Sequence, residues 1–119
     1  MRKLVFAAIA LAMGAGEAAR ADAVLVLNSD EASYSILSRS SRIELARYPV
    51  GREPHHVIVT PDGKEMLIGS TVTNELLGLD IKTGERTRVV KDVIDPYHMG
   101  FSPNGKWFVT AAYRLDHVD

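Results

Sequence analysis

The sequence predicts an all-β fold, a partial β-propeller of about two to two and a half four-stranded antiparallel blades that follow a signal peptide. The first observation is a repeat, because PHHVIVTPDGK at residues 54–64 returns as PYHMGFSPNGK at residues 96–106. A period of about 42 residues is the length of one propeller blade. The second and third observations are the turn motifs inside the repeat and the β-rich runs that flank them. No segment after residue 21 keeps a helical apolar period, so helices should be few or absent.

Residues 1–21 have the features of a secretory signal peptide. Arg2 and Lys3 precede an apolar run at residues 4–15, and small residues suitable for cleavage stand at positions 19–21. The run is shorter than the roughly 20 apolar residues that a membrane-spanning helix needs. An uncleaved anchoring or amphipathic helix is the alternative. Cleavage leaves residues 22–119 as the propeller repeats, and we expect a periplasmic or secreted protein without membrane contact.

The composition narrows the possible partners and cofactors. Of 119 residues, 46% are hydrophobic and 24% are charged, which is typical of a soluble globular domain. The chain has no cysteine, which excludes disulfides, thiolate metal ligands and covalent attachment of c-type haem. Removing residues 1–21 takes away three basic residues and one acidic residue, so the net charge falls from -1 to -3. Because the remaining Lys and Arg are scattered, nucleic acid is not an expected partner.

The repeated motif has the chemistry of a β-hairpin turn. Pro61 sets φ for the first turn position, Asp62 suits the second, and Gly63 can take the positive φ that closes the loop. Residues 102–106 repeat this motif with Asn104 in place of the aspartate. The flanking β-rich runs, which we expect to be strands, are residues 55–59, 66–70, 98–101 and 107–111.

Two further strands are expected after the first hairpin. Residues 75–81 give a third strand, and residues 80–84 give a turn with an aspartate and a glycine. Residues 87–91 are β-branched and polar, as the outer edge of a sheet should be. A weaker match one period upstream indicates a degenerate earlier copy; it pairs Leu25, Val26, Tyr34 and Leu37 with Leu67, Ile68, Leu76 and Leu79.

These motifs resemble the YVTN repeats of the YncE-like β-propellers, a family related to lactonase and cytochrome d1-type propellers. The matching segments are VGREP at residues 50–54, VTPDGK at 59–64 and LGLDIKTG at 77–84, and the resemblance covers residues 23–119. The first copy departs from the pattern, because Ser38 and Arg42 stand where Asp80 and Gly84 fall.

The resemblance implies a closed ring of about seven blades, of which this chain holds roughly 2.3. We therefore expect an N-terminal fragment of a longer propeller, or a piece that closes by association. An open stack exposes sheet faces and edge strands. The remaining blades or self-association are needed to cover them.

Three histidines are the candidate binding residues. The first strand of each hairpin is the innermost, so His56 and His98 should lie one blade apart near one rim of the central channel. Strand alternation places His55 on the opposite face from His56. The resemblance to nitrite-reductase-type propellers implies haem d1 over the channel mouth, with histidines of adjacent blades above the iron. Hydrogen bonding to backbone between blades, or binding of another small ligand, explains the same spacing.

Other polar and aromatic residues have structural explanations. Asp116 and His117 point to opposite faces if they lie in a strand, so they cannot act on one atom together. The large apolar side chains of the second hairpin are expected to pack between blades; they are Tyr97, Met99, Phe101, Trp107 and Phe108. No nucleophile motif, phosphate loop or metal-ligand spacing is found in the sequence.

The sequence thus predicts an exported YncE-like propeller repeat protein that acts as a ligand- or protein-binding module at the channel, without catalytic residues, cofactor or metal of its own. The alternative is a cofactor-handling or enzymatic propeller, either haem d1-binding and nitrite-reductase-like or lactonase-like. In that alternative His56 and His98 are the cofactor-binding residues.

Overall fold

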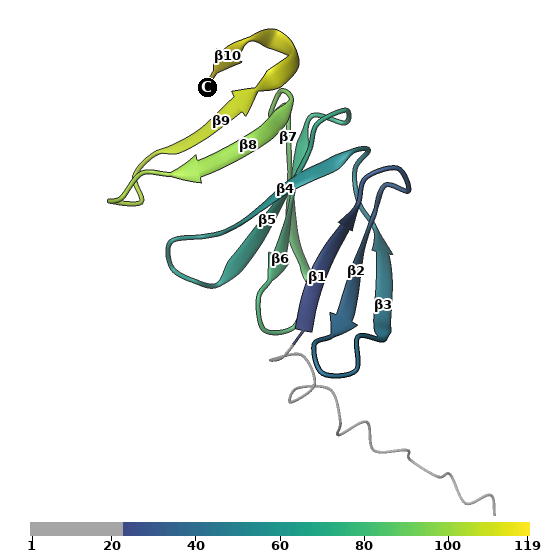
Figure 1. Ribbon diagram of the computed structural model, residues 1–119. Coiled ribbons are helices and arrows are strands. Elements are labelled where there is room, and N and C mark those ends of the chain that lie inside the picture. The colour runs from purple at the N-terminus through teal and green to yellow at the C-terminus, as the bar shows by residue number, and fades with distance from the viewer. Residues whose placement is uncertain (1–22) are drawn as a thin grey trace, which may run out of the picture.

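A computed structural model describes residues 23–119, which form ten β-strands and one short 3-10 helix (Figure 1). The predicted signal peptide, residues 1–21, lies outside the described residues. The strands make three antiparallel sheets that follow one another along the chain and stand side by side. The predicted partial propeller is confirmed. No helix in residues 23–119 is long and apolar enough to cross a membrane.

Each sheet is built from strands in chain order. The first sheet contains β1 (Ala23–Asn28), β2 (Ser33–Ser38) and β3 (Glu44–Pro49). The second contains β4 (Pro54–Val59), β5 (Glu65–Ser70), β6 (Glu75–Asp80) and β7 (Arg86–Lys91). The third contains β8 (Pro96–Phe101), β9 (Phe108–Ala112) and β10 (His117–Val118), with the helix η1 (Tyr113–Leu115) between β9 and β10.

A shift by one period of the sequence repeat relates the three sheets. It maps β4, β5 and β6 onto β8, β9 and β10, and it maps β1, β2 and β3 onto β5, β6 and β7. The second sheet is therefore one complete blade. The first sheet has no counterpart of β4 within the described residues, and the third sheet has only two residues of the counterpart of β6.

The backbone conformation recurs at the same interval as the sequence. The residues with positive φ that are one period apart are Ala32, Asn74 and Asp116, then Arg42 and Gly84, then Glu53 and Asp95, then Gly63 and Gly105. A left-handed residue is uncommon outside glycine, so this coincidence is a strong sign of a structural repeat. The predicted turns at residues 60–64 and 102–106 thus adopt the same shape.

The first copy keeps its turn despite the missing glycine. Arg42 has φ of 60°, close to the 71° of Gly84. The Arg42 N–H donates to the Ser38 carbonyl at 2.8 Å, and the Gly84 N–H donates to the Asp80 carbonyl at the same distance. Tertiary context therefore overrides the local preference against an arginine here.

The hydrophobic core lies between the first and second sheets. Tyr34, Ile68, Leu77 and Leu79 are almost fully buried there. Burying an aliphatic side chain of this size stabilises a fold by about 1.5–3 kcal/mol. The partly buried side chains that pack on this core are Leu25, Leu27, Ile36, Val50 and Val57. Sheet-on-sheet packing is what the repeat predicts, because each blade buries a face only against a like neighbour.

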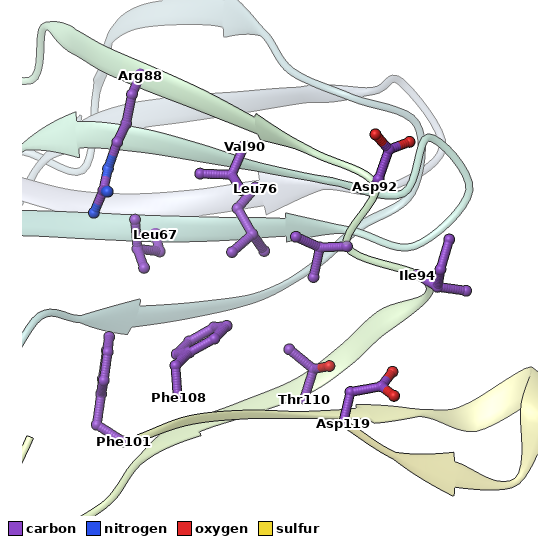
Figure 2. Close-up of a pocket in the computed structure, with 11 residues that line it drawn as sticks. Leu67, Leu76, Arg88, Val90, Asp92, Ile94, Phe101, Phe108, Thr110 and Asp119 are labelled. Carbon is purple, nitrogen blue, oxygen red and sulfur yellow. The ribbon is translucent and has the colours of Figure 1, made fainter. Parts of the chain in front are cut away.

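The expectation that Trp107 packs between blades is wrong, because this side chain is 70% exposed. Phe108, the next residue, points into the space between the second and third sheets (Figure 2). Side chains alternate along a strand, so Trp107 lies on the other face of the third sheet. No further sheet covers that face within residues 23–119.

Candidate functional site

The two histidines singled out by the repeat lie against each other. β4 and β8 are the first strands of neighbouring sheets, and they run in contact. The rings of His56 and His98 stack with centroids 4.3 Å apart and planes at 11°. His56 is half-buried and His98 is exposed. We refer to the inner edge formed by β4 and β8 as the inner rim.

A backbone hydrogen bond determines the tautomer of His56. The Met99 N–H donates to His56 Nδ1 at 2.9 Å, so Nδ1 carries a lone pair and the proton of the neutral ring sits on Nε2. Burial lowers the pKa of His56, and the neighbouring His98 and His55 lower it further. His56 is thus held as a neutral ring whose Nε2–H can donate to a bound molecule.

His55 has the opposite tautomer. Its Nδ1 lies 3.0 Å from the carbonyl oxygen of Tyr97, and because a carbonyl only accepts, Nδ1 carries the proton and Nε2 the lone pair. The His55 ring also stacks on Tyr97 with centroids 3.7 Å apart. Two adjacent residues therefore present one acceptor nitrogen and one donor nitrogen.

The expectation that His55 and His56 point to opposite faces is wrong. Both side chains contact residues of β8, on the same neighbouring sheet. The cause is a register shift in the β4–β5 pairing between Pro54 and His56. A bulge inserts one extra residue into a strand and breaks the alternation of its side chains. The same shift occurs between Pro96 and His98.

The stack at His55 continues through two tyrosines. Tyr97 stacks on Tyr113 of η1 with centroids 4.9 Å apart, and Tyr113 is 69% exposed. Sequence reasoning assigned Tyr97 to the packing between blades and did not single out Tyr113. The one-period interval between His55 and Tyr97 was the available signal for the first contact. No sequence pattern pointed to the second.

The buried side chain of Asp95 connects the second and third sheets beside the stack of His55, Tyr97 and Tyr113. Asp95 is 2% exposed; its Oδ2 accepts from the Arg114 N–H at 2.6 Å, and its Oδ1 lies 3.3 Å from Arg114 Nε. The Asp95 N–H donates to Asn74 Oδ1 at 2.9 Å. Arg114 also donates to the carbonyl of Thr71. Arg114 thus serves this clasp, while His117 pairs with Asp119 at 3.1 Å.

A cavity of about 550 Å³ lies between the second and third sheets, and we call it the inter-sheet groove. Figure 2 shows its two walls, with Leu67, Leu76 and Val90 on the second sheet facing Phe101, Phe108 and Thr110 on the third. The middle of the groove is therefore apolar, and its charged side chains come from Arg88, Asp92 and Asp119.

Metal-ligating side chains do not gather in the part of the chain that the structure describes. No group of three or more His, Asp or Glu residues in 23–119 is placed to hold a metal ion. The inner rim offers ring nitrogens and stacked aromatic faces instead. These groups can donate or accept hydrogen bonds and offer ring faces for stacking.

The comparisons with known proteins agree on the architecture. A family model described as a YNCE-like beta-propeller matches residues 3–119. Hydrazine synthase of Kuenenia stuttgartiensis is similar in structure, with a TM-score of 0.63, 20% identity, and coverage of 76% of this chain and 26% of that chain. Dihydro-heme d1 dehydrogenase NirN, solved in complex with DHE, is similar with a TM-score of 0.63 and 18% identity. The match covers 76% of this chain and 20% of that chain.

A Bacteroides fragilis protein provisionally described as a 6-phosphogluconolactonase gives a TM-score of 0.61, 15% identity, and coverage of 82% of this chain and 30% of that chain. Identities this low show the shared fold alone. The chain spans only 20 to 30% of the length of these structures. No curated protein sequence matches it.

Proposed function

Since the chain belongs to the YNCE-like β-propeller family, we propose that it is a binding module of an exported propeller, which holds a ligand or a protein segment at the inner rim and has no catalysis of its own. The observation that carries the proposal is the stacked pair of His56 and His98. Export is supported by the basic and apolar start of the sequence.

The geometry favours hydrogen bonding over acid–base chemistry. His56 Nδ1 is occupied by the Met99 N–H, and no described residue forms a hydrogen bond with His56 Nε2. A general base needs a partner that orients it and a free lone pair at the reacting proton. His56 offers a free donor instead, so it suits recognition of a ligand oxygen such as that of a carboxylate or an amide.

A fragment screen followed by NMR tests this function. We expect small carboxylates and amides to shift the side-chain resonances of His56 and His98, and His98→Gln to weaken those shifts. His117→Gln is the matched control, because His117 pairs only with Asp119 among the described residues and should leave binding unchanged. The proposal fails if the inner-rim resonances respond to no fragment, or if hits respond equally to both variants.

A cofactor-handling or enzymatic propeller is the second candidate. This candidate is supported by the structural similarity to NirN in complex with DHE. It is also supported by the similarity to the Bacteroides fragilis protein that is provisionally described as a 6-phosphogluconolactonase. His56 does not fit as an iron ligand, because its Nε2 carries the proton; His55, with a free Nε2 lone pair, fits that role better. His56 and His98 fit as groups that contact a molecule held near the iron.

Haemin titration separates the two functions. A shift in the haemin absorption spectrum with the wild-type protein, absent from the His55→Ala variant, would favour the cofactor-handling function. Hydrolysis of 6-phosphogluconolactone above the spontaneous rate would favour the lactonase-like one. We expect neither signal from the binding module.

A further inference from the structure

A small hollow lies between the outer strands of the first and second sheets, away from the inner rim. It has a volume of about 200 Å³, and we call it the outer hollow. Pro49 and Val50, at the end of β3, line it on the first sheet, and Leu77 of β6 and Val89 of β7 line it on the second. β2 pairs with β3, and β6 with β7, along almost their whole length. The outer hollow is therefore bounded by complete strands on both sides.

Arg86 gives the outer hollow a positive charge that no described residue balances. Glu75 and Arg86 are the charged side chains that line it. Glu75 is paired with Lys91. Arg86 forms no ion pair within residues 23–119 and instead donates to the carbonyl of Pro49, which is a neutral group. A guanidinium has five N–H donors, so this bond leaves others for an anion.

The residues on the other side of Arg86 do not balance its charge either. Arg86 also lines a neighbouring hollow, together with Tyr34, Tyr48 and Glu85. Burial raises the pKa of the Tyr34 hydroxyl from its ordinary value of 10.0, and the nearby Arg86 lowers it by less, so the phenol is neutral. Glu85 accepts from the Thr83 hydroxyl at 3.4 Å and does not line the outer hollow. An anion that binds Arg86 in the outer hollow therefore avoids this carboxylate.

The lining and the size of the outer hollow favour a short organic acid as the anion. Arginine binds a planar carboxylate through two parallel hydrogen bonds. Val50, Leu77 and Val89 offer aliphatic contacts beside Arg86, which a hydrocarbon tail can use and an inorganic anion cannot. The hollow is smaller than the pockets of about 300 to 1,000 Å³ that hold drug-sized ligands, so the tail must be short.

We propose that the outer hollow binds a short aliphatic carboxylate, whose carboxylate group lies on Arg86 and whose tail packs on Val50, Leu77 and Val89. The site is formed by the outer strands and contains none of the histidines of the inner rim, so the inference does not depend on the proposed function. Arg86 is exposed, and water weakens ion pairs at such positions. We therefore expect an affinity in the millimolar range.

An NMR titration of the whole chain with isovalerate tests the proposal. We expect saturable shifts of the Val50 and Val89 methyl resonances and of the Arg86 side-chain N–H. Isovaleramide has the same shape without the charge and should bind about tenfold more weakly. Acetate lacks the branched tail and should bind about threefold more weakly. Equal affinities for isovalerate and isovaleramide would overturn the proposal.

Two arginine variants locate the bound acid. Arg86→Gln removes the charge but keeps an amide donor for the Pro49 carbonyl, and it should weaken isovalerate binding about tenfold. Arg88→Gln is the matched control, because Arg88 lies on the same strand but pairs with Glu65 and lines the inter-sheet groove. We expect this control to bind isovalerate as the wild type does. Equal losses in the two variants would show that the acid does not lie on Arg86.

The end of a peptide carries the same carboxylate, and acetyl-Gly-Val distinguishes the two sources. Its last residue has a branched tail, but its backbone must leave the outer hollow, so we expect it to bind more weakly than isovalerate. Tighter binding that Arg86→Gln abolishes would overturn the assignment to a free acid. The His56 and His98 resonances report the inner rim separately. Isovalerate that shifts these two histidines and leaves Val50 and Val89 unchanged would also overturn the proposal.

Discussion

The imidazole rings of His56 and His98 stack 4.3 Å apart, although the two residues stand one full repeat apart in the sequence. The contact exists because β4 and β8 are the first strands of adjacent sheets. It also keeps His56 neutral, since burial and then the neighbouring histidines lower its pKa. Stability should therefore depend on pH through this residue.

Lowering the pH from about 7.5 to about 5.5 is expected to reduce the free energy of unfolding. The pKa of His56 in the folded protein lies below its ordinary value of 6.5. The unfolded chain thus takes up a proton that the folded chain resists, and stability falls as the pH drops through 6.5 towards the folded pKa. Protonation also removes the acceptor for the Met99 N–H.

Urea unfolding at both pH values measures this effect. His56→Asn should show a smaller loss of stability on acidification than the wild type. Hydrogen bonds lower the pKa values of the Asp62 and Asp80 carboxyls from their ordinary value of 3.8, so their titration lies outside this window. Identical pH dependence in wild type and variant would contradict the prediction.

Arg42→Gly is expected to stabilise the protein by about 0.5 to 1 kcal/mol. Glycine adopts a left-handed conformation without strain. This relief of strain exceeds the cost of the larger entropy that glycine gives the unfolded chain. Arg42 has φ of 60° in a turn that matches the turn closed by Gly84. Thermal melting should show a rise of a few degrees. The reverse change, Gly84→Arg, should lower Tm; a loss of stability in Arg42→Gly would show that the arginine side chain stabilises the turn.

Gly69→Ala is expected to destabilise the contact between the second and third sheets by about 1–3 kcal/mol. A Cβ at this position would come within 2.6 Å of the Pro96 carbonyl oxygen and 3.1 Å of Met99 Sδ. Gly100→Ala is the matched control, because a Cβ there meets no atom within 4 Å. Chemical denaturation of both variants tests the prediction, and equal effects would contradict it.

Asp95→Ala is expected to cost about 2–4 kcal/mol, because it removes the buried acceptor for the Arg114 N–H and the partner of its guanidinium. Asp95→Asn should cost less, since the amide oxygen still accepts one hydrogen bond. Asp30→Ala, at an exposed turn position, should change stability little. Urea unfolding compares the three. Equal stability of Asp95→Ala and wild type would show that the clasp does not hold the sheets together.

Much of the fold could be predicted from the sequence because its signals are local. The turns at Pro61 and Pro103 depend on a few consecutive residues, and the strands between them follow from β-branched and aromatic residues. The repeat interval placed His56 near His98, because residues at equal positions in successive blades face each other across neighbouring inner strands.

The predictions failed at positions where contact with another sheet determines the orientation or the exposure of a side chain. Trp107 looked like a core residue, but its exposure depends on whether a further sheet covers that face. The bulge at Pro54 to His56 turns His55 towards β8. No residue in that stretch predicts a bulge. The clasp between Asp95 and Arg114 joins residues 19 positions apart through η1, an element that the repeat does not contain.

By itself, the sequence determined the period, the hairpin turns and the choice of sheet over helix, because backbone preferences act over a few bonds. Only the tertiary structure decided the tautomers of His55 and His56 and the stacking of His55, Tyr97 and Tyr113 at the inner rim. Each of these depends on which atoms a neighbouring sheet brings within hydrogen-bonding or van der Waals distance, and those atoms lie a whole repeat away along the chain.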